Sequence, residues 1–166
     1  MEVQLSRTEA LARSVLQKYN HQKYWNYRAK VIDPAYKSKL GNYRMLWYIK
    51  RADAFNNAST GTHINFGAKF ASPPNLPHGL NGIIISHNAV IGKNCTIFHQ
   101  VTIGEGRGGA PTIGDNVLIG AGSKVIGGIH IGNNAKIAAG LSVMQDIPDN
   151  AVVLPGELKI KIKNGD

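Results

Sequence analysis

The chain has 166 residues and is 43% hydrophobic, enough for one compact domain with a sizeable core. Its single cysteine, Cys95, excludes an internal disulfide, and the longest aliphatic run is far too short to span a membrane. The start of the chain has no apolar signal-peptide region, so we expect a cytoplasmic protein. The net charge of +9 favours an anionic partner, either a phosphorylated small molecule or an anionic membrane surface. The signatures of nucleic-acid-binding modules are missing, and we expect no nucleic-acid partner.

Residues 1–58 have the apolar spacing of helices and form the first predicted region. The pair Ser6 and Glu9 has the spacing of a capping box, which predicts a helix that begins there. A second helix is expected over about residues 22–32 and a third over about residues 42–56. We therefore expect a helical N-terminal region ahead of a different architecture.

From residue 85 onward an aliphatic residue returns every six positions, apart from one spacing of ten. This period is too long for a helix and fits a short strand plus a corner, so three such units make one triangular coil. Weaker positions carry the phase back to about residue 60, which predicts roughly four coils over residues 59–155 with a shared aliphatic core. The inward positions are Ile85, Ile91, Ile97, Ile103, Ile113, Ile119, Val125, Ile131, Ile137 and Val143.

Small or aliphatic residues form a second inward column, which includes Cys95. A buried apolar setting blunts a thiol, so Cys95 is interpreted as a core residue rather than a nucleophile. Asparagines stand where a corner requires a positive φ, a conformation that asparagine tolerates better than most residues. The positions expected to adopt it are Asn88, Asn94, Asn116, Asn133 and Asn134.

The repeat breaks twice, and chemistry is expected where the rhythm fails. The first break, 77–84, contains His78, and the second is the glycine-rich segment 104–112 with four additional residues. The second segment lacks the Lys-Ser/Thr of a phosphate-binding P-loop, so we interpret it as a flap over a neighbouring site.

Two stretches carry a resemblance to a known family: 76-LPHGLNGIIISHNAVIGKNCTIFHQVTIG-104 and 111-PTIGDNVLIGAGSKVIGGIHIGNNAKIAAG-140. They resemble the serine acetyltransferases and, still more, their hexapeptide-repeat relatives from capsule and exopolysaccharide gene clusters. The resemblance implies a mainly β protein, a left-handed parallel β-helix, acetyl-CoA as co-substrate, and a homotrimer with CoA between neighbouring solenoids. It also implies that His78 is the general base of a direct acetyl transfer to a hydroxyl.

The chain departs from the serine enzymes beside the implied base. Their Asp before the catalytic His matches Pro77 here, and their Arg-His pair matches Gly109 and Ala110. Because charged serine would be desolvated without partners, we expect a neutral saccharide acceptor, free or linked to a nucleotide or a lipid. Serine O-acetyl transfer in cysteine biosynthesis is the alternative within the family. A trimeric scaffold without catalysis is the alternative from another class, against which the retained His78 argues.

The group that orients His78 has three candidates. The family's orienting Asp matches His63 in this chain, and Glu105 in the flap is a replacement carboxylate. A backbone carbonyl is the third choice, and the sequence does not select among them. His99 is also ambiguous, since it could face the cleft or a neighbouring subunit.

The resemblance places CoA along the solenoid. Backbone groups near Gly104, Ala121 and Ala139 are implied to bind the pantetheine, Gln145 stands where the family has Lys, and Lys159 matches a basic residue for the CoA phosphates. The alternating lysines of the basic tail, 156–166, would equally protect an exposed strand edge.

Zinc-dependent carbonic anhydrases use the same solenoid with a three-histidine site. The separations from His78 to His87, His99 and His130 are 9, 21 and 52 residues and do not match their pattern. No metal is therefore expected, and His87 and His130 are interpreted as solvated.

Overall fold

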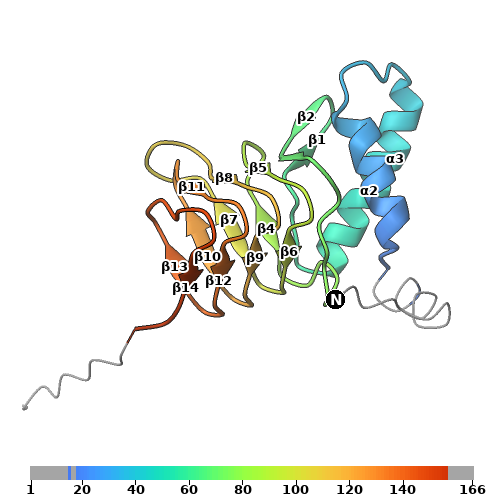
Figure 1. The fold of residues 1–166 in the computed structure, drawn as a ribbon. Helices are drawn as coiled ribbons and strands as arrows, with labels where there is room; N and C mark the ends of the chain where they lie inside the picture. Colours follow the sequence, from blue (N-terminus) through green and yellow to red (C-terminus); the bar gives the residue numbers. More distant parts are fainter. Residues whose placement is uncertain (1–14, 16–17, 157–166) are drawn as a thin grey trace, which may run out of the picture.

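The computed structural model describes Val15 and residues 18–156, and it is a parallel β-solenoid with two helices at one end (Figure 1). Helix α2 (His21–Ile32) and helix α3 (Lys39–Phe55) confirm the second and third predicted helices. The predicted helix from Ser6 and the basic tail with Lys159 lie outside the described residues.

Each helix begins at a polar side chain that satisfies a free backbone amide. The Asn20 side chain accepts from the Lys23 amide at the start of α2, and the Ser38 hydroxyl accepts from the Gly41 amide at the start of α3. The apolar spacing predicted helices from about residues 22 and 42, and the structure begins them slightly earlier, at His21 and Lys39, where these capping side chains lie.

The solenoid has three faces, each a parallel sheet of four strands two or three residues long. The first face contains β4 (Ile84–Ile85), β7 (Thr102–Gly104), β10 (Lys124–Ile126) and β13 (Ser142–Val143). The second face contains β3 (Lys69–Phe70), β5 (Val90–Ile91), β8 (Thr112–Ile113) and β11 (His130–Ile131). The third face contains β6 (Thr96–Ile97), β9 (Leu118–Ile119), β12 (Lys136–Ile137) and β14 (Val152–Val153). Ahead of them, β1 (Thr62–His63) and β2 (Phe66–Gly67) form a small antiparallel pair.

The number of coils differs from the prediction. One isolated bridge extends each face by a level, which makes five levels instead of roughly four. The first coil, from Ser59 to about Asn75, pairs with the next through its backbone and lacks the full aliphatic pattern. The weaker positions of the repeat already reached this coil, and the count fell short because it stopped at Val143, whereas Ile147 and Val153 add a further level to the second and third faces.

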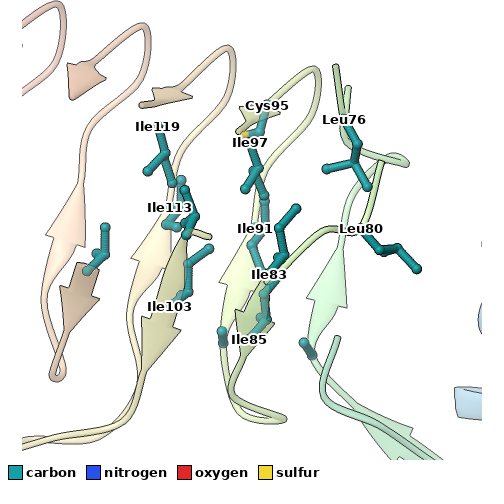
Figure 2. Close-up of a cluster of buried hydrophobic side chains, with 14 of the residues drawn as sticks. Leu76, Leu80, Ile83, Ile85, Ile91, Cys95, Ile97, Ile103, Ile113 and Ile119 are labelled. Carbon is teal, nitrogen blue, oxygen red and sulfur yellow. The ribbon is translucent and has the colours of Figure 1, made fainter. Parts of the chain in front are cut away.

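All ten predicted inward positions are buried and pair in register with the next coil. Figure 2 shows six of them, from Ile85 to Ile119. Within a face, Ile85 pairs with Ile103 and Ile91 pairs with Ile113. The second pair is four residues further apart in sequence than the first, so the chain loops out between them without disturbing the stack. Each stacked isoleucine removes apolar surface from water worth about 2 kcal/mol.

The helices are attached to the solenoid through a buried polar cluster. Arg28 is 2% exposed and donates from Nη2 to the carbonyls of Thr60 (3.1 Å) and Ala68 (2.5 Å). The Tyr24 hydroxyl donates to Asp53 Oδ1 at 2.6 Å and also meets the Thr60 hydroxyl at 2.6 Å. Two helices and the first coil thus share one hydrogen-bonded network.

The corners between faces form three edges, which we name by a residue each carries. The His78 edge joins the third face to the first, at residues 76–83, 98–101, 120–123 and 138–141. The His63 edge joins the first face to the second, at residues 60–68, 86–89, 105–111, 127–129 and 144–146. The asparagine edge joins the second face to the third, at residues 71–74, 92–95, 114–117, 132–135 and 148–151.

The asparagine edge tests the positive-φ prediction. Asn94, Asn116 and Asn134 have φ between 55° and 59°, as expected, and their amides form a ladder that ends on Asn150. The prediction is wrong for two residues, which do not adopt positive φ. These two residues are Asn88 and Asn133. The side-chain amide of Asn88 donates to Glu105, and the side-chain oxygen of Asn133 accepts from the Asp115 backbone amide, so both stabilise their corners by side-chain hydrogen bonds.

Among the described residues, no helix has the length and apolar character needed to cross a membrane.

Candidate active site

The loop that carries His78 is held by its neighbours in the chain. Leu76 and Leu80 are buried on either side of it, 8% and 0% exposed. Gly79 has φ +67°, a conformation that an L side chain strains, and its amide donates to the Leu76 carbonyl at 3.0 Å. Two anchored leucines and a left-handed glycine therefore present an exposed His78 at the corner.

His78 lies against His99, which occupies the same edge one coil further along. Their Nδ1 atoms are 2.6 Å apart, and the ring planes are tilted by 39° with centroids 4.6 Å apart. Phe98 adds an edge-on contact to the His78 ring at 5.8 Å. The contact engages Nδ1 and leaves Nε2 of His78 as the ring nitrogen that a general base could use.

Two of the predicted CoA-binding positions share the His78 edge. Amide-to-carbonyl hydrogen bonds link its successive corners: Gln100 donates to Asn81, Gly122 to His99, and Gly140 to Ala121, at 2.8, 3.0 and 2.8 Å. Ala121 lies beside Gly122, and Ala139 lies beside Gly140 in the next coil. The implied base and these two alanines thus lie along one continuous edge of the solenoid.

The two side-chain candidates for orienting His78 lie on a different edge. His63 stacks on Phe66 at 4.5 Å between ring centroids and meets His87 edge-on at 5.7 Å. Desolvation, followed by repulsion from Lys50 and His87, lowers the pKa of His63 below 6.5. Glu105 accepts a hydrogen bond from Asn88. Within one chain, Nδ1 of His78 therefore contacts His99, whereas His63 and Glu105 contact other residues of the His63 edge.

The remaining predicted residues are spread more widely. Gly104 ends β7, where its carbonyl accepts from the Gly127 amide at 3.1 Å, and Gln145 is exposed on the His63 edge. Cys95 is buried, its thiol contacts the Gly114 carbonyl at 3.2 Å, and burial raises its pKa, which confirms the core interpretation. Among the described residues, no group of three or more His, Cys, Asp or Glu side chains could hold a metal ion.

His99 is the residue that sequence reasoning left undecided. It follows His78 by 21 residues, which is one coil of 18 plus the three extra residues of the first break. That arithmetic places both on one edge, but it requires knowing that the extra residues fall between Leu76 and Ile85. The separation of 21 residues therefore contains the information that His78 and His99 share an edge, but the six-residue periodicity alone does not reveal it.

Comparison with known families gives a match to the hexapeptide repeat of succinyl-transferase over residues 112–145. The chain is 38% identical over 115 residues to a serine acetyltransferase of Mycobacterium tuberculosis, covering 66% of this chain and 50% of that protein. It is 37% identical over 126 residues to a serine acetyltransferase of Staphylococcus aureus, covering 72% of this chain and 59% of that protein. The chain thus spans about half the length of the curated relatives it matches.

Solved structures agree with these matches. A serine acetyltransferase of Brucella abortus in complex with coenzyme A has a TM-score of 0.62 and 28% identity, over 87% of this chain and 55% of that one. A serine acetyltransferase of Neisseria gonorrhoeae in complex with serine has a TM-score of 0.61 and 29% identity, over 89% of this chain and 59% of that one. Both coverages of this chain extend beyond the solenoid into the helical region.

Proposed function

Because the chain belongs to the hexapeptide-repeat acyltransferases, we propose that it transfers an acetyl group from acetyl-CoA to a hydroxyl, with His78 as general base. The observation that carries the proposal is the exposed His78 at the break of the repeat, with one ring nitrogen held by His99. A non-catalytic scaffold would have no use for a histidine held in this way.

The chemistry follows from the weakness of a neutral hydroxyl as a nucleophile. Nε2 of His78 takes the hydroxyl proton as the oxygen attacks the thioester carbonyl carbon. The carbon–sulfur bond then breaks, and the proton passes from His78 to the departing thiolate, so the products are an ester and free CoA. No covalent enzyme intermediate is needed when both substrates are held together.

Acetyl-CoA is proposed to lie along the His78 edge. Ala121 and Ala139 follow His99 down this edge, one per coil, and Ala139 is exposed while Ala121 is half-buried. A ligand along the edge would meet backbone groups at a regular spacing of one coil. Gly104, Gln145 and Lys159 remain predictions from the family resemblance, since the first two lie outside this edge and the third outside the described residues.

Serine is the first candidate acceptor. The relatives and the structural neighbours are named serine acetyltransferases, and one neighbour is described in complex with serine. These names favour serine over the predicted saccharide, which none of the comparisons supports.

A neutral hydroxyl acceptor stays as the second candidate because of specific residues. Pro77, Gly109 and Ala110 carry no charge at positions where the family resemblance implies groups that hold an amino acid. Burying the ammonium and carboxylate of serine without such partners costs several kcal/mol.

We also propose a homotrimer, for a geometric reason. The His78 edge and the His63 edge border the same first face of the solenoid. If three chains turn that face toward a threefold axis, the His78 edge of each chain meets the His63 edge of the next. His63, Glu105 and the flap would then approach His78 from the partner subunit, which gives these predicted residues a place in the site. Light scattering should show a mass of three 17.9-kDa chains, and a fully active monomer would contradict the arrangement.

The function is tested by thiol release from acetyl-CoA with serine and, separately, with a panel of sugars. His78→Ala should lower turnover with the preferred acceptor at least about 100-fold, because the base contributes about that much. His130→Ala is the matched control, since His130 is exposed on β11 and points away from the core. Turnover that survives in His78→Ala would refute the proposal, and turnover with a sugar but not with serine would select the second acceptor.

A further inference from the structure

The contact between the two histidines has a consequence for how protons are arranged. Nδ1 of His78 and Nδ1 of His99 are 2.6 Å apart, which is hydrogen-bond distance. In a neutral imidazole one nitrogen carries the proton and the other has a free lone pair. One of the two Nδ1 atoms must therefore donate and the other accept, so the two rings cannot be in the same tautomer.

The base role selects one of the two arrangements. A general base needs a free lone pair on the nitrogen that meets the substrate, which for His78 is Nε2. His78 must then carry its proton on Nδ1 and donate it to Nδ1 of His99, and His99 must carry its own proton on Nε2. We propose that His99 is the positioning residue of the active site: it holds His78 in the tautomer and ring orientation required for catalysis. The inference rests on the proposed function for the role of Nε2, whereas the opposed tautomers follow from the contact itself.

The backbone around His99 is built to keep its ring in place. The His99 carbonyl accepts from Gly122 at 3.0 Å, and the Gln100 amide donates to Asn81 at 2.8 Å, within the loop that carries His78. Gln100 has φ +57°, a strained conformation for glutamine that persists only where the surroundings enforce it. The residues on either side of this corner, Ile97 and Val101, are both fully buried. The His99 main chain is thus fixed to the coil above and to the coil below.

A histidine in this position acts differently from a carboxylate. When Nε2 of His78 gains the hydroxyl proton, the ring becomes a cation, and the lone pair of His99 accepts a stronger hydrogen bond from it. His99 stays neutral in this step, so it orients the base without neutralising it. A proton added to His99 instead occupies the accepting lone pair and removes the hydrogen bond.

Two substitutions separate positioning from mere packing. His99→Gln retains a side-chain oxygen that can accept from Nδ1–H, whereas His99→Leu has a comparable volume and no acceptor. Thiol-release kinetics on the full chain should show a fall in kcat of about 10–100-fold for His99→Leu, since loss of a partner that orients a catalytic or ligating histidine has about this effect. The KM for acetyl-CoA should stay within about twofold, and His99→Gln should recover most of kcat. Thermal unfolding of both variants serves as the control for folding. A Leu variant with undiminished kcat, or a Gln variant as impaired as Leu at equal stability, would overturn the inference.

A second measurement does not depend on activity. Nitrogen-15 chemical shifts of the histidine rings distinguish a protonated nitrogen from one with a free lone pair, and His99→Gln assigns the His99 signals. When both rings are neutral, we expect the proton of His78 on Nδ1 and that of His99 on Nε2. The opposite pair of tautomers would overturn the inference even in an active enzyme. The expected pair in a protein without acetyl transfer would refute the proposed function and leave the tautomer assignment standing.

Discussion

Asp53 is a buried carboxyl whose protonation should change the stability of the fold with pH. It lies on α3 and is 3% exposed, and its Oδ1 accepts a hydrogen bond from Tyr24. Its Oδ2 is buried without a hydrogen-bond partner. Desolvation outweighs the favourable hydrogen bond from Tyr24 and the attraction of Lys50 and Arg28, and raises the pKa of Asp53 from 3.8 to about 6. The protonated carboxyl is therefore the form that the fold prefers.

The direction of the pH dependence follows from this raised pKa. Between 3.8 and about 6 the folded protein binds more protons at Asp53 than the unfolded chain does, so stability falls as the pH rises through this window. The full effect is about 3 kcal/mol, of which about 2 kcal/mol separates pH 4.5 from pH 8. Asp53→Asn removes the titration and retains an oxygen that can accept from Tyr24.

The assay is urea unfolding of the wild type and Asp53→Asn at about pH 8 and about pH 4.5. Relative to wild type, the Asn variant should lose about 2 kcal/mol of stability when the pH falls between these values. Taking the difference cancels other groups, including His21, whose pKa is lowered by burial and whose effect on stability has the opposite sign. A difference that does not change with pH, or that changes in the other direction, would refute the reasoning about the buried carboxyl.

Two further substitutions test the attachment of the helices and the packing of the corners. Arg28→Lys should lower the free energy of unfolding by about 2–4 kcal/mol, because the planar guanidinium contacts the rings of Trp25 and Phe70 while its Nη2 donates to two carbonyls, and a lysine ammonium cannot reproduce the planar contact. Trp25 fluorescence during urea unfolding reports the loss, and an unchanged midpoint would contradict it. Gly120→Ala should destabilise by about 1–3 kcal/mol, because its Cβ would lie 2.5 Å from the Ala139 amide nitrogen. Gly122→Ala is its control, because an added Cβ at Gly122 would meet open space and the only cost is the strain of φ +71°. In thermal unfolding, Gly120→Ala should be the less stable of the two variants, and the reverse order would count against the steric argument.

The two breaks of the repeat lie on different edges of the solenoid. The first break of the repeat lies on the His78 edge, and the second lies on the His63 edge, with the first face between them. In the proposed trimer, association through this shared face would bring the proposed base on one edge next to the glycine-rich segment on the other edge of the neighbouring chain.

The amino-acid sequence by itself determined the architecture of the solenoid and the position of its implied base. An aliphatic residue every six positions is a local rule, repeated in every coil, and all ten inward positions were predicted correctly. Helices α2 and α3 were also predicted, because the apolar spacing of a helix is a local pattern. The sequence also marked His78 as a candidate base, because it interrupts the six-residue repeat at a family motif.

Only the tertiary structure decided which residues share an edge. A corner's neighbours depend on the number of residues in each coil, and the breaks add three residues before Ile85 and four after Ile103. The first insertion, which lies between His78 and His99, places these two histidines on the same edge, while His63 and Glu105 lie on the other side of the first face. The side chain that contacts His78 is therefore set by how the coils stack, and short-range sequence patterns do not encode it.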